Sequence, residues 1–484
     1  MSSTALATAP FADEQRFELA PRWSSLLIGA IGAVAVILVG AGAGYQPKLG
    51  VGLVIAVALA LLALLRPVTA ALVLVAVVPA VAGLARGLPV PGLRPSEALI
   101  GGLAPIILLV RSSRTAPPWR ALDWLALLYV LTTVVLGSVD LLTRHAPFSM
   151  SNLGTLLGPV QFLILYRAVA STLVTPERRA LALRLVLLAS VPISILTLLQ
   201  QFNIGPTRAF ITTITGTDIY STVTQEGIPR ATGPFPHWHQ LGGYLMIVLL
   251  IGVATLIEKR REVLPKWGLI AVLVPASLAL LQTVTASPII GFLVGSLLLA
   301  WWAGKTGKVA VWLVVAAAVL GLAFAPLLGS RASQQFQTSH QTGSSGAVPQ
   351  TIGYRYQVWQ TEYVPLLSGR LLTGYGPDVP QQLNFPYTES LYITLLMRGG
   401  IPLLLVYAAL MCAFVAAGAR AGRSDDPERR IAGRVLVVVV GVLIFIHLLE
   451  SYFVDSGPPQ LMWLLLGLMV PTAVRKGVTQ RTPV

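Results

Sequence analysis

Charged residues are scarce in this chain. Lys, Arg, Asp and Glu make up only 11% of its 484 residues, whereas 55% are hydrophobic, and the mean hydropathy is +0.76. Soluble globular domains carry about 25% charged residues, so this composition excludes an ordinary water-soluble fold. It predicts an all-α polytopic membrane protein whose outer surface faces hydrocarbon.

Cysteine and acidic residues are also few. The single cysteine, Cys412, lies inside an apolar run, which excludes a disulfide framework and a cysteine-based metal site. The 34 basic residues outnumber the 19 acidic ones, a balance that could attract nucleic acid. However, the basic residues lie mainly in short loops between apolar runs, as the positive-inside bias produces, and we therefore expect no nucleic-acid partner.

Apolar segments that are long enough, or nearly long enough, to cross a membrane recur along the chain. They lie at residues 24–43, 49–65, 69–85, 95–110, 122–142, 152–174, 181–202, 239–257, 267–282, 288–304, 308–329, 390–417, 431–452 and 457–474. Some of these segments are short enough to be re-entrant. The sequence therefore predicts a bundle of 12–14 transmembrane helices.

The basic clusters predict the orientation of this bundle. They all face the cytoplasm if both chain ends do, which gives cytoplasmic tails at 1–22 and 475–484 and a membrane domain at 23–474. Two long polar loops, 203–238 and 330–389, then lie outside. Within the second loop, the aromatic stretch from Tyr354 to Tyr363 is expected to form a short amphipathic helix on the bundle or the membrane interface.

Three arginines on the external side, Arg230, Arg355 and Arg370, are candidates for binding an anionic ligand. A guanidinium is always charged, and its rigid fork of donors suits a diphosphate. The alternative is that each one pairs with a lipid headgroup or a loop carbonyl. For Arg230, the Gly-Pro turn that follows it favours the ligand.

Two histidines follow Arg230, in the order His237-Trp238-His239. On a regular helix they would point about 200° apart, which is a poor arrangement for two metal ligands, and no nearby cluster completes a site. We predict hydrogen bonds to a substrate or to the loop. Capping of the following helix is an equal alternative.

Glu389 stands at the mouth of an apolar segment, where an acid is costly to bury unless it is paired or functional. Its other explanation is a favourable position at a helix N-terminus. Arg398 follows nine residues later, directly before Gly399 and Gly400. We predict a slanted surface helix over 389–398 that breaks at the two glycines.

Near the C-terminus, His447 and Glu450 are three residues apart and would share one helix face. The favoured interpretation is that the two side chains bond to each other inside the bundle.

Three stretches together resemble the O-antigen ligase and O-antigen polymerase superfamily of bacterial membrane glycosyltransferases. "RATGPFPHWHQLGGYL" is similar to its arginine, Gly-x-Phe, proline-rich turn and helix. "YRYQVWQTEYVPLLSGRLLTGYGPD" is similar to its external arginine, a tryptophan four residues on, and a Gly-x-Gly turn. "TESLYITLLMRGGIPLLL" is similar to the stretch that begins the next span. The resemblance covers about residues 200–420.

The chain departs from this pattern at three positions. Glu389 replaces the usual histidine, Leu403 replaces a glycine, and Pro288 in "TASPIIG" replaces an arginine.

The resemblance implies an inverting, metal-independent transfer of a glycan. The donor would be an undecaprenyl-diphosphate-linked glycan, and the acceptor a hydroxyl of a glycan or lipid-glycan. The reaction would occur on the outer, periplasmic face of a bacterial cytoplasmic membrane, in contact with membrane lipids and without a cofactor. Arg230 and Arg355 would hold the diphosphate, and Glu389 would act as the base. Substrate-binding contacts are expected from His237, His239, Arg370, Arg398, Tyr354 and Trp359.

Two alternatives belong to other classes. A transporter or flippase of an anionic or lipid-linked solute would need charged residues deep within several spans, and the predicted spans hold almost none. A non-catalytic scaffold of an envelope-synthesis complex would make the external arginines accidental.

Overall fold

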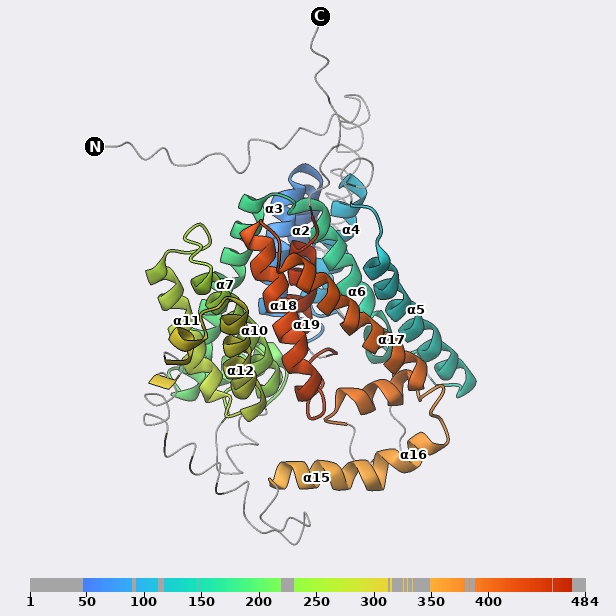
Figure 1. Cartoon of the computed structure of the whole chain (residues 1–484). Helices are drawn as coiled ribbons and strands as arrows, with labels where there is room; N and C mark the ends of the chain where they lie inside the picture. Colours follow the sequence, from blue (N-terminus) through green and yellow to red (C-terminus); the bar gives the residue numbers. More distant parts are fainter. Residues whose placement is uncertain are drawn as a thin grey trace, which may run out of the picture.

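The computed structural model describes residues 47–88, 93–111, 117–146, 148–218, 230–311, 349–378, 388–454 and 456–471, with a few single residues between them. In these ranges the regular elements are helices packed into one bundle (Figure 1), which confirms the all-α polytopic membrane fold. The predicted span at 24–43, both predicted tails and most of the span at 308–329 lie outside the described residues.

The other predicted spans coincide with helices. These are α2 (Pro47–Leu65), α3 (Pro67–Val81), α4 (Pro95–Arg111), α5 (Ala121–Thr143), α6 (Met150–Thr172), α7 (Pro176–Gln201), α10 (Trp238–Ile257), α11 (Lys266–Gln282), α12 (Ala286–Trp302), α17 (Leu391–Ala421), α18 (Pro427–Ile446) and α19 (Pro458–Leu468). The span predicted at 431–452 is too long, because α18 ends at Ile446 and a loop follows it. Two short helices lie within the predicted external loops: α8 (Thr207–Thr215) in the first and α15 (Gln350–Val358) in the second.

Helix α10 is the core of the bundle. It packs against α7, α11, α12, α18 and α19, and every residue from Leu241 to Gly252 is buried. Its sequence is therefore apolar all round rather than on one face, as expected of a helix surrounded by other helices.

The outer helices expose apolar side chains. On α5, a row spaced three or four residues apart is between 45% and 62% exposed. This row consists of Leu128, Leu131, Val135, Val139 and Leu142. An exposed apolar row of this length fits a lipid-facing surface. By length and composition, α5, α6, α7, α10 and α17 are each able to cross a membrane.

The antiparallel packing of α10 and α18 defines two polar ends of the bundle. At one end, the Glu258 carboxylate after α10 accepts from Arg430 (2.9 Å) and Arg434 (2.7 Å) of α18. At the same end, Arg260 pairs with Glu428 at 2.8 Å, and Arg179 pairs with Asp426. We call this the basic end. The other end, where α10 begins and α18 finishes, we call the loop end.

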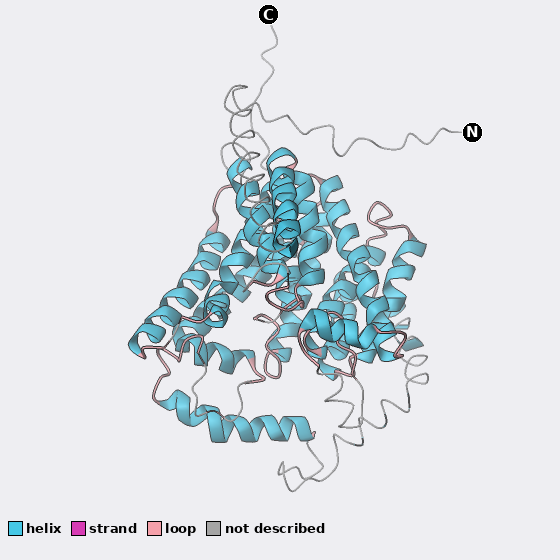
Figure 2. Cartoon of the chain, turned by 180° about the vertical axis from the view of Figure 1, so that it is seen from behind, coloured by secondary structure: helices cyan, strands magenta, loops and turns pink. Residues whose placement is uncertain are grey.

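A helical rod crosses the loop end (Figures 1 and 2). It consists of α15, the π-helical turn η2 (Trp359–Tyr363) and α16 (Val364–Ser368). Val358, Tyr363 and Leu367 are buried against Met397 of α17, whereas Tyr356 is 61% exposed. The rod confirms the predicted amphipathic helix.

Helix α17 breaks where the sequence predicts. Gly399 and Gly400 leave helical geometry, and Gly400 has φ +64°. A Cβ at Gly400 would lie 2.4 Å from the Leu371 carbonyl oxygen, and the Ile401 amide donates to that same oxygen at 2.7 Å. The break therefore requires glycine, both for its backbone angle and to seat the loop that follows α16.

Candidate functional site

Hydrogen bonds to Gln200 and Gln282 hold the turn that follows Arg230. The Gln200 side-chain carbonyl accepts from the amides of Thr232 (2.9 Å) and Gly233 (2.8 Å), and the Ala231 amide donates to the Gln282 carbonyl at 2.9 Å. Gly233 has φ +53°, an angle that glycine adopts without strain. These bonds fix the backbone beside Arg230, as the sequence predicted for this turn.

The Arg230 guanidinium stacks on the first residue of α10. Its central carbon lies 4.7 Å from the Trp238 ring centroid. Cation–π stacking holds the planar guanidinium in place over the indole ring.

The two histidines lie together, which their helical spacing did not predict. Their ring centroids are 4.8 Å apart, because His237 precedes α10 in an extended conformation (φ −137°, ψ 146°) and only His239 is on the helix. The divergence expected of two residues on one regular helix therefore does not apply. His239 also faces Tyr452, with ring centroids 6.1 Å apart.

The helical rod holds the segment before α17 at two points one turn apart. The Trp359 indole donates to the Thr388 carbonyl at 2.8 Å, and the Arg355 guanidinium bonds the Glu389 carboxylate. Burial raises the pKa of Tyr354, and the Glu389 carboxylate raises it further. The Tyr354 phenol therefore stays protonated near Glu389. The structure thus brings Arg355, Glu389, Tyr354 and Trp359 together, as expected.

Arg355 also contacts a second acid, Glu450, with Nη2 3.4 Å from Oε1. The other Glu450 oxygen, Oε2, lies 4.0 Å from Nδ1 of His239. Contacts therefore run from Glu389 through Arg355 and Glu450 to His239. We call these four residues the loop-end cluster.

Exposure separates the two acids of the loop-end cluster. The Glu389 side chain is 41% exposed and the Glu450 side chain only 12%. Glu389 also has φ +52°, a left-handed backbone angle that is uncommon for a residue with a side chain. Its neighbours hold it there, since the Ser390 hydroxyl and the Leu391 amide both donate to the His447 carbonyl. Glu389 is the acid that an incoming molecule can reach.

The expected pairing of His447 with Glu450 is wrong. The buried His447 bonds the Tyr407 hydroxyl through Nδ1 at 2.8 Å, and its Nε2 has no partner among the described residues. Because α18 ends at Ile446, Glu450 lies in a loop and contacts Arg355 instead of His447. The sequence analysis did not identify Glu450 as a site residue, because it placed Glu450 inside a predicted span. Gly457 and the two prolines after it were the signal that a loop lies here.

Arg370 makes a separate set of contacts. It pairs with the buried Asp140 of α5 at 2.7 Å and stacks on Tyr375 at 5.1 Å. Arg144 pairs with the same Asp140 at 2.5 Å and donates to the Tyr375 carbonyl. These bonds tie the loop after α16 to the end of α5. A substrate contact by Arg370 stays a prediction.

Arg398 lines a cavity of about 460 Å³ that also holds Arg86 and Arg94. The sequence analysis did not single out Arg86 or Arg94 as candidate site residues. An arginine on a side of the protein that carries few basic residues was the available signal.

The arrangement at the loop end suits anion binding beside a carboxylate. Arg355 donates from Nε to Glu389 and from Nη2 to Glu450, and no described residue accepts from its third nitrogen, Nη1. The Nη1 donors are therefore able to bind an anion. Arg355 is therefore able to orient Glu389 and hold an oxyanion together.

A search of curated proteins finds none that matches the chain. A family model described as O-antigen ligase matches residues 270–408, a range that contains Arg355, Glu389 and Arg398. This match confirms the resemblance for the second and third stretches, whereas the stretch that carries Arg230 lies outside the matched residues. It supports glycan transfer by a membrane enzyme in O-antigen or polysaccharide assembly. The O-antigen ligase domain at residues 270–408 supports the assignment of this chain to the O-antigen ligase and O-antigen polymerase superfamily.

Proposed function

We propose that the chain transfers a glycan from an undecaprenyl-diphosphate-linked donor to an acceptor hydroxyl. The observation that carries the proposal is the bond of Arg355 to the exposed carboxylate of Glu389, inside the matched O-antigen ligase segment. This bond joins an anion-binding guanidinium to a carboxylate base at the mouth of a membrane helix bundle.

The transfer is a single displacement at the anomeric carbon. The acceptor oxygen forms a bond to that carbon from one face, while the bond to the diphosphate oxygen breaks on the other, so the configuration inverts. The acceptor's proton passes to the Glu389 carboxylate, and the polyprenyl diphosphate leaves with the bonding electrons.

Fixed positive charge assists this step. Arg230, held over Trp238, and the third nitrogen of Arg355 stabilise the negative charge that grows on the leaving diphosphate. A diphosphate with this support is a good leaving group, so the step needs neither an acid catalyst nor a metal ion. The polyprenyl chain would lie along the apolar helix faces, with the loop end on the outer side of the cytoplasmic membrane.

The test is a transfer assay with a lipid-linked glycan donor in proteoliposomes. We expect Glu389→Gln to lower the rate on the order of 100-fold or more, because the proton loses its acceptor. Arg355→Ala should lower it on the order of 100- to 1,000-fold, because charge on the leaving group loses a fixed donor.

Asp378→Asn is the matched control. Asp378 is also 41% exposed and lies near an arginine, with 3.9 Å between its Oδ2 and Arg144 Nη1, yet it is outside the loop-end cluster. Its replacement should leave the transfer rate within twofold. Full activity in both Glu389→Gln and Arg355→Ala would refute the proposal, and solute uptake without transfer would favour a transporter.

A further inference from the structure

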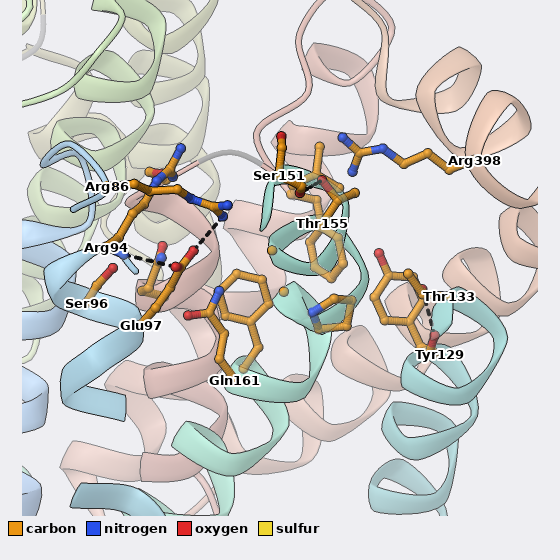
Figure 3. A pocket seen from close by; sticks show the side chains of 18 of the residues that line it. Arg86, Arg94, Ser96, Glu97, Tyr129, Thr133, Ser151, Thr155, Gln161 and Arg398 are labelled. Carbon is orange, nitrogen blue, oxygen red and sulfur yellow. Dashed lines mark hydrogen bonds and ion pairs between the residues drawn. The ribbon is translucent and has the colours of Figure 1, made fainter. Parts of the chain in front are cut away.

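A polar cavity of about 460 Å³ lies outside the loop-end cluster (Figure 3). It lies among the starts of α4, α6 and α19, the middle of α5 and the break in α17. Helices α4 and α6 begin at its wall, and helix N-termini add partial positive charge. None of the loop-end cluster residues lines it.

The cavity wall is strongly positive. Three guanidinium groups, those of Arg86, Arg94 and Arg398, face a single carboxylate, that of Glu97. Arg86 pairs with Glu97 at 2.9 Å, the Arg94 guanidinium reaches Ser456, and Arg398 enters from α17 on the far side. Figure 3 shows Arg86 and Arg398 on opposite sides, with Ser151 and Thr155 between them. The wall therefore carries two more positive charges than negative ones.

Gly154 is shaped to admit one of these arginines. A Cβ at this position would lie 2.1 Å from Nη2 and 2.2 Å from Nη1 of Arg86. Only a residue without a side chain lets the guanidinium lie on this turn of α6, where Nη1 also donates to the Met150 carbonyl at 3.1 Å. The position of Arg86 in the cavity is thus built into the helix.

The uncharged part of the wall suits a sugar. It offers hydroxyl groups from Ser96, Thr133, Ser151 and Thr155, and aromatic surface from Tyr129 and Phe453. A few polar groups on an apolar, aromatic wall are typical of sites for small molecules.

Gln161 adds an unmet hydrogen-bond acceptor. The Gln161 side chain lines the cavity, and its buried Oε1 has no partner among the described residues. A buried polar atom without a partner is costly, and a ligand hydroxyl would satisfy it.

Two segments join the cavity to the loop-end cluster. The first part of α17 carries Glu389 just before its start and Arg398 at its end, a rise of about 12 Å over eight helical residues. The loop from 450 to 456 carries Glu450 at one end and Ser456 at the other. A short oligosaccharide that extends from the cavity along α17 would therefore reach Glu389.

We infer that this cavity binds the acceptor: a saccharide that carries a carboxylate or phosphate group. Arg94 and Arg398 hold its acidic group, Arg86 completes the positive wall, and the hydroxyl groups and Gln161 bond its ring. The role as acceptor rests on the proposed function, whereas binding of an acidic saccharide stands on the cavity alone.

The test measures binding without any donor. The full-length chain in phosphatidylcholine nanodiscs is titrated calorimetrically with an acidic probe, hyaluronan tetrasaccharide, and a neutral one, maltotetraose. We expect the acidic probe to bind at least tenfold more tightly. Arg94→Gln and Arg398→Gln should each weaken it about tenfold or more, because each removes a charge-assisted hydrogen bond.

Gly154→Ala offers a variant that keeps every charge. Its methyl group displaces the Arg86 guanidinium and should weaken the acidic probe several-fold. Arg208→Gln is the control, since the Arg208 guanidinium bonds the Gln200 carbonyl (3.1 Å) and does not line the cavity. Its affinity for the acidic probe should equal that of the wild type.

Several results would overturn the inference. Equal binding of both probes, or no saccharide binding at all, would contradict an acidic-saccharide site. Loss of binding in Arg355→Ala but not in Arg398→Gln would place the probe outside the cavity. A further contradicting result would be that phosphatidylglycerol in the nanodisc competes with the acidic probe and that Arg398→Gln removes this competition. The last would assign the cavity to a lipid headgroup. If binding holds while Glu389→Gln and Arg355→Ala keep full transfer, the saccharide site stands and only its role as acceptor fails.

Discussion

The two polar ends of the bundle use arginine in opposite ways. At the basic end, acids from neighbouring helices meet the guanidinium groups, as when Glu258 takes both Arg430 and Arg434. At the loop end, Arg355 meets one acid that is 41% exposed and one that is 12% exposed, and a neighbouring cavity holds three arginines for one carboxylate.

This difference shows what each end is for. Pairs between helices, with both partners largely covered, hold helix ends in register and leave little for a ligand. Arginines that line a cavity, or that keep donors beyond their paired acid, are able to take a further anion. Arginine thus joins helices at the basic end and is able to bind a ligand at the loop end.

The strongest test of the comparison is Glu258→Ala at the basic end. It leaves Arg430 and Arg434 without their shared carboxylate, which is only 14% exposed. Removing one partner from a covered pair costs about 3 kcal/mol of unfolding free energy, so the thermal midpoint should fall clearly. Transfer per folded molecule should not change.

Glu262→Ala is the control for Glu258→Ala. Glu262 is 63% exposed and lies 3.5 Å from Arg260, so its loss should cost less than about 0.5 kcal/mol. Loss of transfer in Glu258→Ala without a lower midpoint would break the distinction between the two ends.

The second test is Glu450→Gln at the loop end. Its carboxylate orients Arg355 and lies beside His239, so neutralising it should misplace the guanidinium that supports the leaving group. We expect kcat to fall about 10- to 100-fold, or about 1.4 to 2.7 kcal/mol, with the thermal midpoint nearly unchanged.

Glu450→Asp separates positioning from simple stability. It keeps the charge on a shorter side chain and should recover part of the rate. A fall in stability with kcat intact, or no recovery in Glu450→Asp, would show that Glu450 is only a structural residue of the loop.

The sequence predicted the elements of the fold well because their signals are local. Apolar runs located the helices, and the two glycines after Arg398 located the break in α17. The aromatic stretch after Tyr354 located the helical rod. In each case the residues that decide the structure lie within the element itself.

The geometry of the site was predicted less well because it depends on where helices start and stop. His237 lies just before α10 in an extended conformation, and this conformation brings its ring beside that of His239. The earlier end of α18 turns Glu450 towards Arg355. The cavity joins Arg86 to Arg398 across more than 300 positions of chain, a distance that no local pattern spans.

The smallest expected effect concerns strain, and it compares one residue at each end. Glu389 at the loop end and Lys259 at the basic end both have positive φ, at +52° and +55°. At each position the glycine variant should be more stable than the alanine variant by about 0.5 to 1 kcal/mol, since only alanine is strained there. Chemical denaturation of the four variants measures both differences.

The activity of these four variants then separates the two ends. Both Glu389 variants should lack transfer, because neither has the carboxylate, whereas both Lys259 variants should retain it. Equal stability of Glu389→Gly and Glu389→Ala would mean that Glu389 is free to leave the left-handed angle. The base would then be positioned by Arg355 alone and not by its backbone, and Arg355→Lys should loosen it as much as Arg355→Ala does.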